Sequence, residues 1–265
     1  MPLPCHGPIP CRLCWPATGE REKVFGPPIA TEPHRFRLVN DPGAWGAQDP
    51  VVMVLGMSKG NTQADAMARA AAGGSFNDVP FAKMRPRLLQ SLQAVGLLPG
   101  VTMLDPMFSA EETDYGWGSI LRCSLTGWNK KTGRWSGASG DVIPGLKDPE
   151  GQDAMVACIH MHLTGLSERT RLIVLLGNDD NYIKVVRRAF ETVFGAATEI
   201  PGAGSQAFQV GAQTVVHIGH PSPLNGFFNN FLTGSPAIPQ GAKRAQAKRA
   251  VELALEGMPR LLARA

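Results

Sequence analysis

Residues 51–56 read VVMVLG, a continuous apolar run that ends in glycine. Such a run is typical of a strand that is buried on both faces of a parallel sheet. The stretches RLIVLLG at 171–177 and TVVHIG at 214–219 repeat this pattern, and residues 117–123 are a further short strand candidate. Helical patterns lie between and after these strands, over residues 61–72, 83–96, 153–166, 180–194 and 241–256. We therefore predict an α/β protein, a three-layer α/β/α sandwich around a central, mostly parallel, four-stranded sheet.

The chain has 265 residues, of which 43% are hydrophobic and 18% charged, a composition typical of a globular protein with a sizeable core. We expect a single domain over 1–265, with a Pro-rich arm at 1–50 and a basic insertion loop at 127–151. The longest apolar run is only strand-sized and the N-terminus lacks the layout of a signal peptide. These features predict a cytoplasmic protein without a membrane partner, and the formal charge of +4 permits a polyanionic one.

The five cysteines are an odd number, which argues against a disulfide framework in a cytosolic protein. Cys11 and Cys14 form a C-x2-C pair, a spacing that lets two thiolates reach one metal or cluster. Cys123 and Cys158 are available to complete a four-thiolate site, with Cys5 as a substitute ligand. Four thiolates suit zinc or an iron–sulfur cluster, and the residues alone leave both open beside a set of inert buried thiols.

Ligands of parallel α/β sheets bind at the carboxyl ends of the strands. The segment after the last predicted strand, residues 220–225, reads HPSPLN. Two prolines make this loop rigid, which fixes His220 beside any molecule in the cleft and lets Leu224 project. On the residues alone, a Pro-rich turn with an incidental histidine is the alternative.

HPSPL after a hydrophobic strand resembles the second motif of the uracil-DNA glycosylase superfamily. The segment GMSKG at 56–60 stands where that superfamily has its first motif, and VPF at 79–81, followed by a Leu-Leu helix, resembles a stretch of its iron–sulfur members. The resemblance covers roughly residues 11–225 and is greatest to the iron–sulfur branch of families 4 and 5. It implies a 4Fe–4S cluster rather than zinc, held by Cys11, Cys14, Cys123 and Cys158.

Enzymes of this superfamily flip a nucleotide out of DNA and hydrolyse its N-glycosidic bond. The resemblance implies that His220 donates a hydrogen bond to the pyrimidine O2, where negative charge develops as the base leaves. It also implies that Leu224 wedges into the gap left by the flipped base and that Phe81 stacks on that base. An ordinary core role is the alternative for Phe81.

The first motif departs from the family pattern because it has no acid. By the resemblance, Ser58 would hold the attacking water, and Asn61 is a second candidate. Asp65 or Asp78 could supply a carboxylate from nearby, and spacing does not choose among these residues.

The base pocket also departs from the pattern of uracil enzymes. Ser119 stands where those enzymes use an asparagine, and a serine hydroxyl cannot make the same two-point contact with the base. No tyrosine or acid blocks a substituent at C5, and the flexible Met57 could yield space. The expected pocket residues are Gly56, Met57, Phe81 and Ser119.

Basic and polar residues around the site are candidates for contacts with DNA. In the insertion loop, Trp128 and Trp135 could stack on a base or a sugar, with Lys130, Lys131 and Arg134 on phosphates. Ser222 and Lys59 are further candidates for the DNA backbone. A solvated surface loop is the alternative for the insertion.

Taken together, these features predict a monomeric DNA glycosylase that excises a 5-substituted pyrimidine, such as a hydroxymethylated or glucosylated base, and leaves an abasic site. Because large 5-substituents occur mainly in viral DNA, a role in defence against modified phage DNA follows as a hypothesis. Repair of uracil or another deaminated base is one alternative. A catalytically inactive binder of damaged or modified DNA is the other.

Overall fold

The computed structural model describes residues 6–15, 19–32 and 34–258, so that Cys5 lies outside the described part of the chain. Among the described helices, none combines the length and the apolar character that a membrane crossing requires. The described strands are β1 (Gly7–Pro8), β2 (Glu22–Phe25), β3 (Phe36–Val39), β4 (Gly43–Gly46), β5 (Val52–Lys59), β6 (Tyr115–Asn129), β7 (Arg134–Ser136), β8 (Leu172–Leu176), β9 (Thr198–Glu199), β10 (Ala207–Val210) and β11 (Gln213–Ile218). The described helices are α1 (Asn61–Ala71), α2 (Arg85–Gln93), α3 (Ser139–Lys147), α4 (Pro149–Leu163), α5 (Asp180–Phe194), α6 (Phe228–Thr233) and α7 (Pro239–Ala254).

Four parallel strands form the centre of the sheet, in the spatial order β6-β5-β8-β11. Antiparallel strands extend both edges: β3 and β4 pair with β6 on one side, and β10 followed by β9 lies beyond β11 on the other. The predicted parallel centre is therefore confirmed, whereas the prediction of a four-stranded sheet is too narrow. The additional strands are short and lack the apolar runs that mark the central ones.

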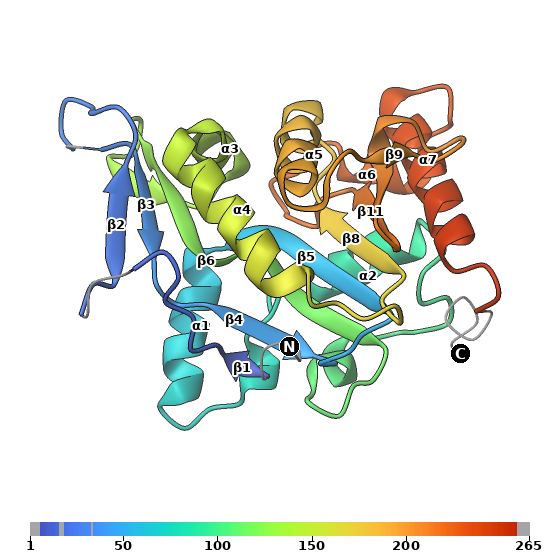
Figure 1. The fold of residues 1–265 in the computed structure, drawn as a ribbon, viewed down its shortest axis with the longest axis horizontal. Coiled ribbons are helices and arrows are strands. Elements are labelled where there is room, and N and C mark those ends of the chain that lie inside the picture. Colours follow the sequence, from blue (N-terminus) through green and yellow to red (C-terminus); the bar gives the residue numbers. More distant parts are fainter. Residues whose placement is uncertain (1–5, 16–18, 33, 259–265) are drawn as a thin grey trace.

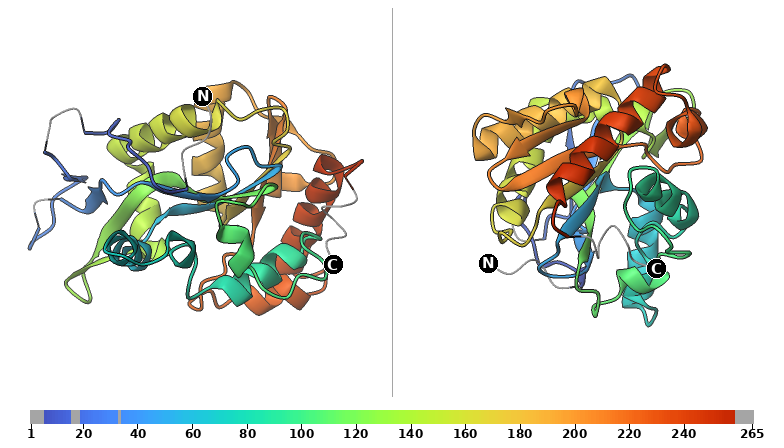
Figure 2. Two further views of the ribbon diagram at one scale, coloured as in Figure 1. Left: turned by 90° about the horizontal axis from the view of Figure 1, so that it is seen from below. Right: turned by 90° about the vertical axis from the view of Figure 1, so that its right-hand side faces the viewer.

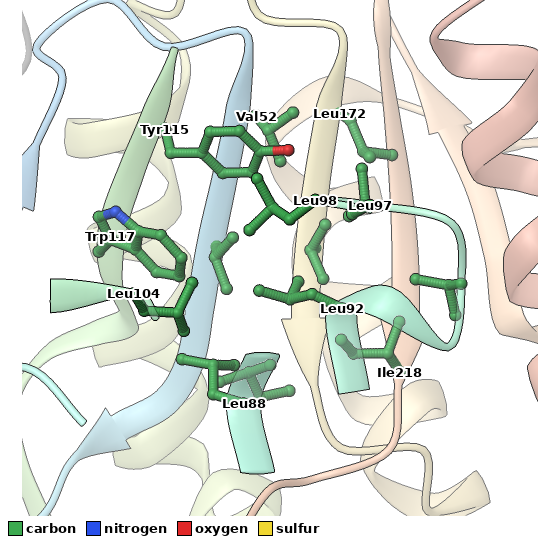
Figure 3. Close-up of a cluster of buried hydrophobic side chains, with 14 of the residues drawn as sticks. Val52, Leu88, Leu92, Leu97, Leu98, Leu104, Tyr115, Trp117, Leu172 and Ile218 are labelled. Carbon is green, nitrogen blue, oxygen red and sulfur yellow. The ribbon is translucent and has the colours of Figure 1, made fainter. Parts of the chain in front are cut away.

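Helices cover both faces of the sheet, which confirms the three-layer α/β/α arrangement (Figures 1 and 2). Residues of a strand alternate between faces: Val52 and Val54 of β5 enter one hydrophobic core, and Met53 and Leu55 enter the other. The first core is completed by α1, α2, α6 and α7, and the second by α3, α4 and α5. Figure 3 shows Leu88 and Leu92 of α2 among the side chains of the central strands, so α2 lies directly against the sheet.

The segment 127–151 is structured, and the prediction of an insertion loop is wrong. β6 continues to Asn129 and returns as β7 through a turn, and α3 follows. Trp128 and Trp135 face each other across this hairpin with ring centroids 5.4 Å apart, and the Asn129 side chain accepts hydrogen bonds from two backbone N–H groups of the turn. Cross-strand aromatic pairs stabilise hairpins, a signal that the polar and Gly-rich composition concealed.

β5 extends past Gly56 as far as Lys59, with a β-bulge between Ser58 and Lys59. The Lys59 side chain is only 1% exposed, and its Nζ lies 3.0 Å from the Asp41 carboxylate and donates to the Asp41 carbonyl. The same carboxylate accepts hydrogen bonds from the Ser124 N–H at 2.8 Å and the Ser124 hydroxyl at 2.7 Å. Asp41 therefore links the N-terminal arm to both β5 and β6.

Replacing Asp41 by alanine should lower the free energy of unfolding by about 3–5 kcal/mol, because it leaves the buried Lys59 ammonium without its counter-charge. Urea denaturation of Asp41→Ala and of the double variant Asp41→Ala/Lys59→Met measures this effect. The double variant should be more stable than Asp41→Ala, since methionine removes the unpaired charge. Equal stability of the two variants would contradict the pairing.

Candidate functional site

The floor of the site lies where β5 and β6 run side by side. Gly56 pairs with Ser119 across the two strands. A Cβ atom placed on Gly56 would lie 3.6 Å from the Ser119 hydroxyl and 3.9 Å from a ring carbon of Phe81. The structure thus brings together three of the four predicted pocket residues. The fourth, Met57, does not join them, because neighbouring strand residues face opposite sides of the sheet and Met57 packs against the second core.

Phe81 is held in an unusual backbone conformation, with a φ of 52° that L-residues rarely adopt. Such a conformation typically costs about 1–3 kcal/mol and persists only where the surroundings fix it. Arg85 of α2 supplies that constraint: its Nε donates to the Pro80 carbonyl at 3.1 Å, and its Nη1 donates to the Asp105 carboxylate at 2.6 Å. The Phe81 ring is 5% exposed and packs near Trp117, with ring centroids 6.3 Å apart.

The His220 loop is held by the same helix. Arg87 of α2 donates two hydrogen bonds to the loop, from Nε to the Pro221 carbonyl at 2.9 Å and from Nη2 to the Ser222 carbonyl at 3.0 Å. The Ser91 hydroxyl donates to the Gly219 carbonyl at 2.6 Å. α2 therefore fixes both the Phe81 segment and the histidine loop.

Hydrogen bonding fixes the tautomer of His220. The Ser222 backbone N–H donates to Nδ1 at 3.1 Å, so Nδ1 is an acceptor and the proton of the neutral ring resides on Nε2. Burial lowers the pKa of His220 to about 4, which keeps the imidazole neutral at physiological pH. His220 is half-buried, and Nε2 has no hydrogen-bond partner among the described residues. His220 can therefore donate one hydrogen bond, from Nε2, to a ligand.

Two large apolar side chains project from the loop. Leu224 is 86% exposed and Phe227 is 65% exposed. Hydrogen bonds inside the loop hold its backbone: the Leu224 N–H donates to the Ser222 hydroxyl, and the Phe227 N–H donates to the Asn225 side chain. The projection of Leu224 is as expected from the sequence, and Phe227 is a second apolar group beside it.

A cavity of about 490 Å³ adjoins this site. Its walls come from α1 and from the segment 74–84, with Pro223 of the histidine loop at the rim. The lining residues are Thr62, Gln63, Ala66, Arg69, Ala70, Gly74, Ser75, Asp78, Val79, Phe81, Ala82, Lys83, Met84 and Pro223. Phe81 thus connects the cavity with the floor of the site, and Pro223 connects it with the His220 loop.

The candidates for holding the attacking water lie at the end of β5. Ser58 is half-buried on the strand, and Asn61 is exposed as the first residue of α1. Within the described chain no carboxylate is hydrogen-bonded to Ser58 or His220. Asp78 lines the cavity, whereas Asp65 does not.

The basic residues expected to contact DNA differ in their surroundings. Lys130, Lys131 and Arg134 are exposed at the β6–β7 hairpin, and a Cβ on Gly137 just after it would lie 3.9 Å from Gly60 at the start of α1. Lys59, in contrast, is buried and paired with Asp41, so the expectation that it contacts a phosphate is not met in this conformation.

The indoles of Trp128 and Trp135 pack on each other. In addition, the Arg37 guanidinium lies 5.1 Å from the Trp135 ring centroid. These contacts give both indoles a structural role in the hairpin.

The four expected cluster ligands interact with one another electrostatically. The pKa of Cys158 is raised to about 12, first by burial and then, among the thiols, by Cys14 and Cys11. Burial likewise raises the pKa of Cys123, and Cys158 and Cys14 contribute further. In the described residues, no three His, Cys, Asp or Glu side chains already form a set that could hold a metal ion. The thiols are therefore neighbours rather than a preassembled ligand set.

A buried cation lies near one of these thiols, Cys158. Arg122 is 2% exposed, and its Nε and Nη1 have no hydrogen-bond partner in the described structure. Burial lowers the pKa of Arg122 to about 10, whereas its neighbour Cys158 acts in the opposite direction. Gly118 makes room for the guanidinium, because a Cβ there would lie 1.9 Å from Nη1. An unpaired buried cation is unfavourable, and a negatively charged metal–thiolate group would compensate it. The residues present therefore fit such a group.

Sequence reasoning missed the residues that position the site, namely Arg85, Arg87 and Ser91, and it also missed Phe227. The signal for the arginines was their place just before the Leu88-Leu89 pair, because a cation so close to buried leucines is itself partly buried and needs hydrogen-bond partners. Phe227 carried no signal, because an apolar residue in a sequence is ordinarily assigned to the core.

Comparison with known proteins identifies no family for this chain: no family model matches it, and no curated protein is significantly similar to it in sequence. The geometry of the site is therefore the basis for a functional assignment.

If these thiols hold a 4Fe–4S cluster, as the resemblance implies, replacing any one of Cys11, Cys14, Cys123 or Cys158 by serine should abolish binding of iron and sulfide, since one ligand would be lost. Metal and sulfide analysis of anaerobically purified protein, with its visible absorption spectrum, measures this. Cys5→Ser is the matched control and should retain the cluster. Zinc without sulfide in the wild-type protein would contradict the assignment of iron.

His220 should not titrate between pH 5.5 and 7.5, because burial lowers its pKa to about 4. The imidazole gains its second proton only as the pH falls toward that value. The chemical shift of the His220 ring Cε1–H, assigned with His220→Ala, measures this titration by NMR. A midpoint between pH 6 and 7 would show that the ring is not held in the neutral state.

Proposed function

We propose that this protein is a DNA glycosylase of the uracil-DNA glycosylase superfamily, similar to its iron–sulfur branch. The observation that carries the proposal is the neutral His220, with Nε2 as its donor, on a rigid loop that shares a cavity wall with Phe81. A neutral donor suits a leaving base that departs as an anion, since the hydrogen bond strengthens as charge develops.

The remaining groups of the site support this chemistry. An extruded base that rests on Phe81 would have Gly56 and Ser119 at its edge, and His220 would donate to O2 of its ring. Leu224, fully projecting, suits the gap that the flipped nucleotide leaves in the duplex. The exposed Lys130, Lys131 and Arg134 suit contacts with phosphates, and Ser222 is half-buried in the same loop as Leu224.

We further propose that the excised base is a 5-substituted pyrimidine, with defence against modified phage DNA as the biological role. Ser119 is too short for the two-point contact that selects uracil. Met57 packs against the second core, on the other face of the sheet, so it places no block at the base edge.

In this proposal a 4Fe–4S cluster, held by Cys11, Cys14, Cys123 and Cys158, fastens the N-terminal arm to β6 and α4. The cluster supplies structural cross-linking when bound. Arg122 compensates its negative charge. The chemistry of base excision remains with His220 and the residues around the pocket.

A panel of duplexes that differ in one base tests the function, with uracil, 5-hydroxymethyluracil, 5-hydroxymethylcytosine or a glucosylated base at the same position. We expect alkali-labile abasic sites with the 5-substituted bases and weaker or no cleavage at uracil. His220→Ala should lower the single-turnover rate by about 10²–10³-fold through loss of the oxyanion donor. His160→Ala, an exposed histidine on α4, is the matched control and should be unaffected.

Each of the other possible outcomes would contradict one part of the proposal. Cleavage confined to uracil would indicate a repair enzyme. Tight binding without cleavage of any duplex would indicate a binder of modified DNA. Equal rates for His220→Ala and the wild-type protein would remove His220 from catalysis.

A further inference from the structure

We propose that the cavity between α1 and the segment 74–84 is a subsite for a hexose-sized, uncharged, hydroxyl-bearing group attached at C5 of the flipped pyrimidine. This inference rests on the proposed function. It assigns a class of ligand to the cavity, which His220 does not line.

The position of the cavity is the first argument. Phe81 belongs both to the base pocket, where its ring approaches Gly56, and to the cavity wall. In a pyrimidine, C5 lies across the ring from O2. A base that receives a hydrogen bond from His220 at O2 therefore directs its C5 substituent away from the imidazole, and the proposal places that substituent in the cavity that Phe81 lines.

The size of the cavity is the second argument. Its volume of about 490 Å³ lies within the usual range of ligand pockets, about 300–1,000 Å³. A hydroxymethyl group alone would leave nearly all of this space to solvent, whereas a hexose attached through that group would fit inside it.

The chemistry of the wall is the third argument. Most of the wall surface is apolar, with Ala66, Val79 and Pro223 among its residues, and this suits the C–H face of a sugar ring. The rest offers hydrogen-bonding groups of both kinds, and these are Thr62, Gln63, Arg69, Ser75, Asp78 and Lys83. Hydroxyl groups both donate and accept, so a wall that carries both kinds of group suits a polyhydroxylated substituent better than one of a single charge.

Two α1 variants test the subsite as a matched pair. Ala66 lines the cavity, whereas Ala68 is exposed on the same helix and does not. Ala66→Phe should lower single-turnover excision of glucosylated 5-hydroxymethylcytosine by about tenfold or more, equivalent to about 1.4 kcal/mol. Excision of 5-hydroxymethylcytosine should stay within about twofold, which also shows that the variant is folded. Ala68→Phe should leave both rates unchanged.

A second variant and a binding measurement make the test independent of catalysis. Ala82→Trp fills the cavity from the segment 74–84, at an exposed position, and should act like Ala66→Phe. Fluorescence anisotropy with the same two duplexes should show that the wild-type protein binds the glucosylated one more tightly and that Ala66→Phe loses this preference.

The inference and the proposed function fail in different ways. If neither duplex is cleaved but the binding preference responds to Ala66→Phe, the glycosylase activity fails and the subsite stands. If both duplexes are cleaved and Ala66→Phe, Ala82→Trp and Ala68→Phe behave alike in rate and in binding, the subsite is overturned and the glycosylase stands. An absence of any binding preference in the wild-type protein also overturns the subsite.

Discussion

The site depends on the hydrogen bonds that two arginine guanidinium groups of α2 donate. Arg85 fixes the segment that carries Phe81, and Arg87 fixes the loop that carries His220. Leu88 and Leu92 of the same helix are fully buried against the sheet. α2 therefore holds both segments in fixed positions relative to the sheet. Hydrogen bonds from charged donors contribute about 1.5–3 kcal/mol each. A preorganised pocket of this kind needs little rearrangement when a ligand enters.

Charge compensation explains a second part of the structure. Lys59 of β5 and Arg122 of β6 are both buried, and among the described residues only Lys59 has a carboxylate partner, Asp41. Arg122 lies near the Cys158 thiol, whose pKa is raised by burial, so the thiol offers the guanidinium no negative charge at neutral pH. A thiolate-bound cluster would reverse this imbalance. It would also join the arm around Cys11 and Cys14 to the body of the protein.

The sequence predicts those features that depend on local pattern. Buried strands such as 171–177 are continuous apolar runs, and α5 begins and ends where helical spacing places it, at 180–194. The histidine loop is recognisable because two prolines leave it few conformations. Features that depend on distant partners are not predictable in this way. In the sequence Lys59 is indistinguishable from a surface lysine, because its partner Asp41 is distant along the chain. The cavity likewise depends on the contact between α1 and the segment 74–84.

The most direct test of the central claim is a crystal structure of the protein bound to a duplex whose target nucleotide carries a 2′-fluorine that blocks cleavage. The account predicts a 5-substituted base that is extruded from the stack and lies on Phe81. Its O2 should be about 3 Å from Nε2 of His220, and its substituent should lie in the cavity beside Ala66. A target base that stays stacked in the duplex, or that binds with O2 remote from His220, would contradict the account.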